Sequence, residues 1–278
     1  MVYSLLNDFN KFIKIMRNHD GSNKIDTSTE SFLSPTTLIP LLCEINNKKI
    51  QYITAHPNTS NYIKDILNKK ATNTRTPFII LPYDENERKN KELSHNTALK
   101  LNKDYGSFFV LKYIIAELTN NIYDHSSFEE GYSNQGYTYC QEYPNKDLLD
   151  ICVMDDGLSI PGRFKKSGIE FNDECHAIEK AISNISTKSE DPLERGNGLW
   201  STIKLVVEGN GGSALIVSDR GYLHIKNKEN YKYDLLNNND IFKGTLISLR
   251  LKKNQVQNIH ELIEIFPGNP YKYKIGRG

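Results

Sequence analysis

A run of residues at 108–126, FFVLKYIIAELTNNIYDHS, most constrains the fold, because its apolar side chains recur at helical spacing. This spacing predicts a helix that buries one stripe against a core and needs a further layer to cover it. Polar residues recur on a neighbouring flank, which a merely solvated helix face would explain equally well. The apolar stripe comprises Leu111, Ile114, Ile115, Leu118 and Ile122, and the polar flank Glu117, Asn121, Asp124 and His125.

Apolar segments of strand length follow this helix. YTYCQEY and LLDICVMDDG are expected to pair as two strands, and GLWSTIKLVVEGNG is expected to form a second helix. SALIVS, GYLHIKN and GTLISLRL then provide three further strands. The order of helix, hairpin, loop, helix, hairpin and strand predicts an α+β fold in which helices cover one face of a mixed β-sheet.

The first hundred residues are expected to form a smaller α/β module. Two amphipathic helices are predicted, within residues 1–20 and 34–47, and Ser34 and Pro35 suit the cap and first turn of the second helix. A polar linker is expected at 21–30. QYITAH and PFIILP read as strands with the helix NYIKDILNKK between them, which predicts a small sheet built by βαβ alternation. No catalytic constellation is visible in this unit.

Composition restricts the class of protein. Hydrophobic residues make up 38% of the chain and charged residues 25%, which is enough for a sizeable core. The formal charge of +1 provides no bulk field for nucleic acid or an anionic membrane. The first residues lack the pattern of a signal peptide, so we expect a cytoplasmic protein. Without metal-ligand spacing, the cysteines are predicted to be buried thiols: Cys43, Cys140, Cys152 and Cys175.

Two glycine motifs carry the chemistry. DDGLSI ends an apolar strand in two carboxylates and a glycine, and RGNGL places two glycines directly before an apolar helix. Glycine lets the backbone approach a ligand closely, and the free N–H groups at a helix start attract phosphate. Either motif alone is common in α/β proteins. Their order and spacing after the helix that carries Glu117 and Asn121 are much more specific.

These segments together resemble the motifs of the GHKL ATPases, the superfamily of gyrase, heat-shock-ninety chaperones, histidine kinases and mismatch-repair ATPases. ELTNNIYDH is similar to the N box, DDGLSI to the first glycine box, RGNGL to the second, and GTLISLRL to the threonine-bearing strand. The resemblance covers about 106–251. It implies a Bergerat-type mixed sheet under helices, with ATP between them and a mobile lid at about 161–195.

The resemblance also implies a role for individual residues. Glu117 would be the base that polarises the attacking water, and Asn121 would hold Mg²⁺ through its amide oxygen. Asp155 would accept a hydrogen bond from the adenine amino group, with Gly157 against the base. The other residues assigned to ATP are Ser159, Ile160, Thr187 and Leu199, Gly196, Asn197 and Gly198 at the phosphates, Lys188 and Arg195 as cations, and Thr245 beside the adenine.

The expected organisation is a module at 1–100, a GHKL-type ATP-binding domain at 101–254, and a helix with a tail at 255–278. The first module loosely resembles STAS-like regulatory modules, which favours a protein partner there, and a homodimer is left open. No membrane partner is expected, and neither is a nucleic acid.

Three functions follow from the resemblance. Mg²⁺-dependent ATP hydrolysis that drives lid closure is the first. A serine-protein kinase of the anti-sigma-factor type is the second, since its substrate would leave no mark here. A non-catalytic nucleotide-binding module is the third, because Ser159 stands where the first box usually has its second glycine. A sensor histidine kinase would need a phospho-acceptor helix before the ATPase core, and this helix is missing.

Overall fold

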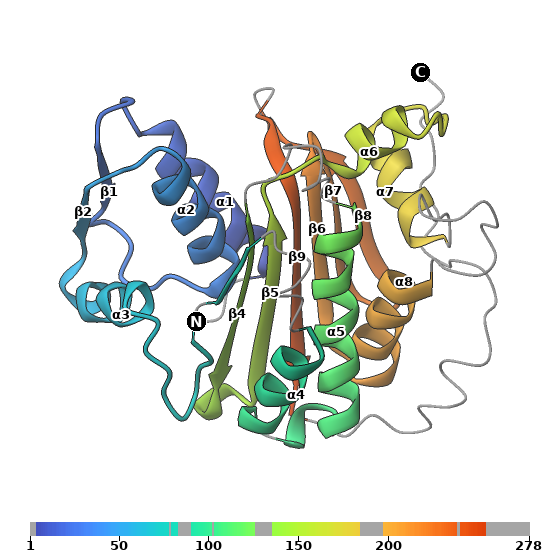
Figure 1. Ribbon diagram of the computed structural model, residues 1–278, viewed down its shortest axis with the longest axis horizontal. Helices are drawn as coiled ribbons and strands as arrows, with labels where there is room; N and C mark the ends of the chain where they lie inside the picture. The colour runs from blue at the N-terminus through green and yellow to red at the C-terminus, as the bar shows by residue number, and fades with distance from the viewer. Residues whose placement is uncertain are drawn as a thin grey trace.

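A seven-stranded sheet forms the middle of three layers in the computed structural model (Figure 1). The structure describes residues 4–77, 79–82, 90–101, 103–125, 135–183, 197–237 and 240–253. In spatial order the strands are β3 (Ile79–Pro82), β4 (Gln135–Tyr143), β5 (Leu148–Asp155), β9 (Phe242–Lys252), β6 (Ser213–Asp219), β7 (Gly221–Asn227) and β8 (Asn230–Leu235). The α+β class is as predicted.

Every neighbouring pair of strands in this sheet is antiparallel, which corrects the prediction of a mixed sheet. The physical reason is local: β4 and β5, β6 and β7, and β7 and β8 follow one another as hairpins, and short connections force antiparallel pairing. The last strand, β9, lies between β5 and β6 and therefore joins the two hairpin groups in the centre of the sheet.

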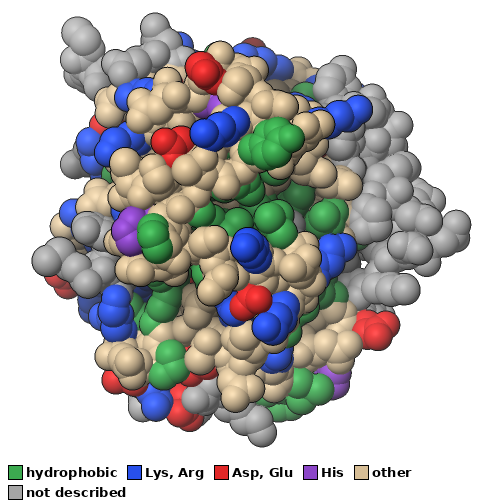
Figure 2. All heavy atoms as spheres, turned by 90° about the vertical axis from the view of Figure 1, so that its left-hand side faces the viewer, with side chains coloured by type: hydrophobic (Ala, Val, Ile, Leu, Met, Phe, Trp, Pro, Cys, Tyr) green, Lys and Arg blue, Asp and Glu red, His purple; other side chains and the backbone are tan. Residues whose placement is uncertain are grey.

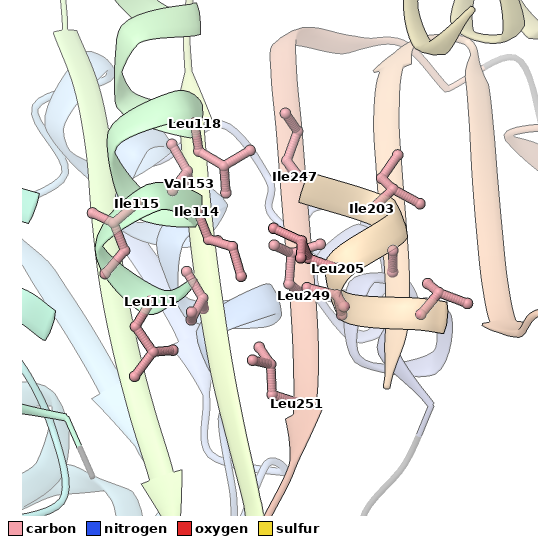
Figure 3. Close-up of a cluster of buried hydrophobic side chains, with 14 of the residues drawn as sticks. Leu111, Ile114, Ile115, Leu118, Val153, Ile203, Leu205, Ile247, Leu249 and Leu251 are labelled. Carbon is pink, nitrogen blue, oxygen red and sulfur yellow. The ribbon is translucent and has the colours of Figure 1, made fainter. Parts of the chain in front are cut away.

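One face of the sheet is covered by the predicted apolar helix, α5 (Phe108–His125), and by four further helices. Side chains on a strand alternate between faces, and Val153 of β5 and Ile247 of β9 belong to the same buried cluster as Leu118 of α5 (Figure 3). The other helices of this layer are α4 (Asn90–Lys100), α6 (Ile160–Lys166), α7 (Glu174–Ile182) and α8 (Asn197–Lys204), which a π-helical turn extends over Leu205–Gly209.

The opposite face is covered by α1 (Leu5–Arg17) and α2 (Pro35–Asn47), whereas only one covered face was expected. Phe9 and Phe12 of α1 meet Phe242 of β9 with ring centroids 5.5 and 6.1 Å apart. Burying one such ring stabilises the fold by roughly 1.5–3 kcal/mol. The first helices therefore share a core with the central sheet.

The predicted module boundary at residue 100 does not divide the structure. β3 pairs with β4 at the edge of the main sheet, and α4 packs beside α5. The small sheet is also different from the prediction: β2 (Tyr52–Ala55), followed by α3 (Pro57–Leu67), pairs in parallel with β1 (Lys24–Thr27), not with PFIILP. β1 lies in the segment that was expected to be a linker. The sequence did not predict this strand, because four residues with only Ile25 and Thr27 buried are too few to show a periodicity.

The segment expected to form a lid contains two helices, α6 and α7. Phe164 of α6 and Ile178 and Ile182 of α7 are buried, so the described part of this segment packs into the body of the fold. Its remainder at 184–195 and the predicted terminal helix after 254 lie outside the described residues. The lid at about 161–195 stays a prediction.

One cation lies between two carboxylates on the face that α1 covers. Arg250 of β9 donates to both carboxylate oxygens of Asp150 on β5, at 2.6 and 2.7 Å, and its Nη2 lies 3.2 Å from Oδ2 of Asp8 on α1. All three side chains are buried. One guanidinium does not fully compensate two buried carboxylates: burial, together with the charge of Asp150, raises the pKa of Asp8 to about 6.

The free energy of unfolding should therefore depend on pH through Asp8. Between its unfolded pKa of 3.8 and its folded value of about 6, the folded chain keeps this proton and the unfolded chain releases it, so stability falls as the pH rises. Asp8→Asn removes this titration and leaves an oxygen for Arg250. In urea unfolding, the wild type should lose up to about 3 kcal/mol relative to Asp8→Asn across this window. A difference that stays constant with pH would contradict the raised pKa.

Candidate functional site

Three polar side chains form a row across the centre of the sheet, at one end of its strands. Asp155 of β5 lies opposite Thr245 of β9, and Thr245 lies opposite Ser218 of β6. The hydroxyl oxygens of Thr245 and Ser218 are 3.0 Å apart. Because the row continues the alternation of Val153 and Ile247, it faces the layer of α5. The structure therefore brings together Asp155 and Thr245, two of the predicted adenine contacts.

Asp155 is a buried carboxylate with an unusual titration. Its side chain is only 7% exposed, and its Oδ1 accepts the backbone N–H of Gly157 at 2.9 Å. Burial raises the pKa of Asp155 to about 7, although the N–H groups of Gly157 and Thr245 pull it down. Among the described residues, no basic side chain forms an ion pair with it. A buried carboxylate held only by backbone N–H groups destabilises the unliganded fold, and such groups cluster at functional sites.

Gly244 lets the backbone of β9 lie close to the backbone of Asp155. Its φ is +80°, and a Cβ at this position would lie 2.0 Å from the carbonyl oxygen of Asp155. The pairing of β6 with β9 shifts register here, between Ser218 and Asp219. A shift of this kind is a β-bulge, which re-aims side chains at the end of a strand and is frequent beside active sites. Gly244 is a site residue that the sequence reasoning missed.

Ser159 has a structural role at the start of the helix that follows β5. It is the N-cap of α6, and its Oγ accepts the N–H of Gly162 at 3.1 Å. The next residue, Ile160, donates its N–H to Oγ of Ser218 at 2.8 Å. The start of α6 is therefore bonded to the polar row. Ser218 was not predicted, and the only sequence signal for it was a polar residue at the end of an apolar strand.

Glu117 on α5 lies directly against the start of α8. A Cβ at Gly198 would be 2.0 Å from Oε2 of Glu117, so only glycine fits here while the carboxylate keeps its place. One turn earlier on α5 and one turn later on α8, the hydroxyl oxygens of Tyr113 and Ser201 are 2.6 Å apart. Burial, and then the charge of Asp124, raises the pKa of Glu117. The predicted base and one predicted phosphate-binding glycine are thus in contact.

Asn121 is one helical turn beyond Glu117 on the same flank of α5, and it is half-buried. Leu199 of α8 and Ile160 of α6 pack against one apolar cluster that also contains Leu118 and Ile122. This cluster connects the helix pair to the polar row. Of the other predicted contacts, Asn197 is the first residue of α8, whereas Thr187, Lys188, Arg195 and Gly196 lie outside the described residues.

Comparison with known proteins does not identify a family. No protein-family model matches the chain, and no curated protein matches it. In the part of the chain that the structure describes, no three or more His, Cys, Asp or Glu side chains are grouped as a metal site would require, and none of the helices has the length and apolar character to cross a membrane. All four cysteines are buried and free, as predicted.

Gly244→Ala should destabilise the fold more than Gly211→Ala. Both glycines have a positive φ, of 80° and 73°, where alanine costs roughly 1–2 kcal/mol. Only at Gly244 would the new Cβ meet backbone, since nothing lies within 4 Å at Gly211. Urea unfolding should therefore show about 1 kcal/mol lost for Gly211→Ala and at least about twice that for Gly244→Ala. Equal losses would mean that the strand at Asp155 yields easily and that the close approach is unimportant.

Proposed function

We propose that this chain has a Bergerat-type fold of the GHKL class, and that it binds and hydrolyses ATP between α5, the end of β5 and the start of α8. The observation that carries the proposal is the contact of Glu117 with Gly198. These residues belong to two motifs that are far apart in the sequence, and an ATP site of this class needs both motifs side by side.

The polar row supports the adenine half of the proposed site. A carboxylate accepts hydrogen bonds only, so Asp155 can bind the amino group of adenine, while Thr245 and Ser218 offer hydroxyl groups beside it. The cost of burying Asp155, seen in its raised pKa, is typical of a group kept for a ligand and not for stability. An incoming amino group would add a donor to the backbone N–H groups of Gly157 and Thr245 that this carboxylate already accepts.

The start of α8 supports the phosphate half. A helix start presents free N–H groups and a partial positive charge, and the lack of a side chain at Gly198, in the first turn of α8, leaves room for the Glu117 carboxylate beside that start. The amide oxygen of Asn121 is a hard ligand that suits Mg²⁺, an ion that takes few protein ligands beside phosphates and waters. When bound, Mg²⁺ would neutralise phosphate charge.

Glu117 is the proposed general base for hydrolysis. Its partial burial raises its pKa, which makes the carboxylate a stronger base once it has lost its proton. The charge of Asp124, also on α5, adds to this effect. In this position Glu117 would hold and polarise a water molecule next to phosphates bound at the start of α8.

A protein partner for the first hundred residues is part of the proposal. The side of the molecule formed by the amino-terminal elements shows hydrophobic side chains among scattered charges (Figure 2). Exposed large hydrophobic residues of this unit include Phe32, Tyr52 of β2 and Leu67 of α3. A second copy of the chain is an alternative occupant of this side. Closure of the predicted lid over ATP is the proposed signal to whichever partner is bound there.

ATP binding should depend on the charge of Asp155. Asp155→Asn keeps an oxygen for the N–H of Gly157 but removes the carboxylate, and ATP affinity in calorimetry should fall by about 10- to 100-fold, which is the worth of a hydrogen bond to a charged group. The matched control is Asp147→Asn, directly before the first residue of β5 and therefore at the opposite end of this strand from Asp155. This variant should bind ATP like the wild type. Mg²⁺ should strengthen wild-type binding. Equal affinities of the two variants would remove the adenine assignment.

Assays of ATP hydrolysis and of Mg-ATP binding should distinguish the role of Glu117 from that of Asn121. Glu117→Gln should still bind Mg-ATP but release phosphate about 10²–10⁴ times more slowly, the usual worth of a positioned general base. Asn121→Ala should weaken Mg-ATP binding itself, and Asn120→Ala, one position away on another part of the helix surface, is the control.

Three outcomes of the phosphate-release assay would change the proposal. Turnover that Glu117→Gln leaves untouched would reduce Glu117 to a carboxylate that stabilises the start of α8. Transfer of the terminal phosphate to a serine of an added STAS-type protein, without hydrolysis, would make the chain a protein kinase. Binding without either reaction would make it a non-catalytic nucleotide module.

A further inference from the structure

The two consecutive carboxylates at the end of β5 serve opposite faces of the sheet. Asp155 faces the layer of α5, and the alternation of side chains along a strand turns Asp156 toward the layer of α2. Asp156 is only 1% exposed, so its carboxylate is fixed by protein groups. The proposed adenine contact is thus joined through one peptide bond to a residue that belongs to the amino-terminal side of the molecule.

Asp156 binds three segments of the chain together. Its Oδ2 accepts a hydrogen bond from Nδ2 of Asn47, the last residue of α2, at 2.9 Å. Its Oδ1 accepts the backbone N–H of Gln135, the first residue of β4, at 3.1 Å. Hydrogen bonds to a charged acceptor are stronger than neutral ones. The end of α2 therefore holds the turn that follows β5.

Helix α2 is a firm support for this contact. Its first turn is anchored to the centre of the sheet, where Oγ1 of Thr36 lies 2.6 Å from Oγ of Ser248. Its last turn is anchored to β4 by Asn46, whose Nδ2 donates to the side chain of Gln135 at 2.6 Å. Asn46 holds the same end of the helix as Asn47 but does not contact Asp156 through any described hydrogen bond.

We propose that Asn47 is a positioning residue of the adenine site: through Asp156 it fixes the turn of Asp155 and Gly157, so that the amino-terminal helices set the affinity for the base. The proposal rests on the proposed function. Asn47 itself lies on the other face of the sheet from the polar row, where its described hydrogen bonds go to Asp156 and Cys43. Its effect should therefore fall on the base and leave the phosphates unaffected.

The first test compares ATP with inorganic tripolyphosphate, which carries the phosphate chain without the base. Asn47→Ala should weaken ATP binding about 5- to 10-fold, the net worth of one hydrogen bond, and change tripolyphosphate binding less than about twofold. Asn46→Ala loosens the same helix end and should leave both affinities near wild type. Equal losses for both ligands, or equal losses in both variants, would mean that α2 only supports the fold.

A polarity swap provides the rescue. Asn47→Asp places a second carboxylate against Asp156 and should weaken ATP binding more than Asn47→Ala, because like charges repel. Adding Asp156→Asn to this variant restores a donor and an acceptor in exchanged positions, and its oxygen can still accept the N–H of Gln135. The double variant should regain most of the affinity. No recovery relative to Asn47→Asp would overturn the proposed link.

A measurement without nucleotide separates this proposal from the proposed function. Hydrogen exchange of the Gly157 amide, which donates to Asp155, should be faster in Asn47→Ala than in the wild type and unchanged in Asn46→Ala. A wild-type chain that binds no ATP would overturn the proposed function, and the exchange rate would then still decide whether Asn47 holds the turn. Unchanged exchange in Asn47→Ala would overturn the positioning role.

Discussion

The buried arginine at the centre of the sheet fixes how the layers meet. Apolar packing of Phe9 and Phe12 supplies most of the energy that holds α1, but it is non-directional. Arg250 forms its ion pairs where β5 and α1 present their carboxylates, and this geometry favours one position of α1 on the sheet. Breaking a buried pair of this kind costs about 3–5 kcal/mol, because a charge is left without compensation. The position of α1 on the sheet is therefore fixed by buried ion pairs in addition to apolar packing.

Side chains on the two central strands alternate between the faces of the sheet, so the residues that anchor α1 and the residues of the proposed site lie on opposite faces. On β5 and β9, one set of side chains carries the anchoring charges of Asp150 and Arg250, and the other set carries Asp155 and Thr245. A rigid antiparallel pair thus serves both faces with the same backbone. In the proposed link through Asp156, the helices on one face would act on the site on the other face through this shared backbone.

Sequence patterns predicted α5, the β4–β5 hairpin, α8 and the strands around it, since these segments are long and strongly periodic. They did not predict α6 and α7, whose few buried positions, such as Phe164 and Ile178, lie among polar residues. The contact of Glu117 with Gly198 could be anticipated only through the family resemblance, because helix pairing is a tertiary property. Nothing local indicated that Asp156 bonds to Asn47, since such a bond depends on the packing of α2.

The central place of β9 has a consequence for biosynthesis. It is the last described strand in the chain, yet it lies between the two hairpin groups. While the ribosome is still making this part of the chain, the inner edges of β5 and β6 have no described strand to pair with, and open apolar edges of this kind invite association with other chains. The polar row also lacks Thr245 until then. Formation of the complete sheet, and of any site that depends on it, is therefore a late event in the synthesis of the chain.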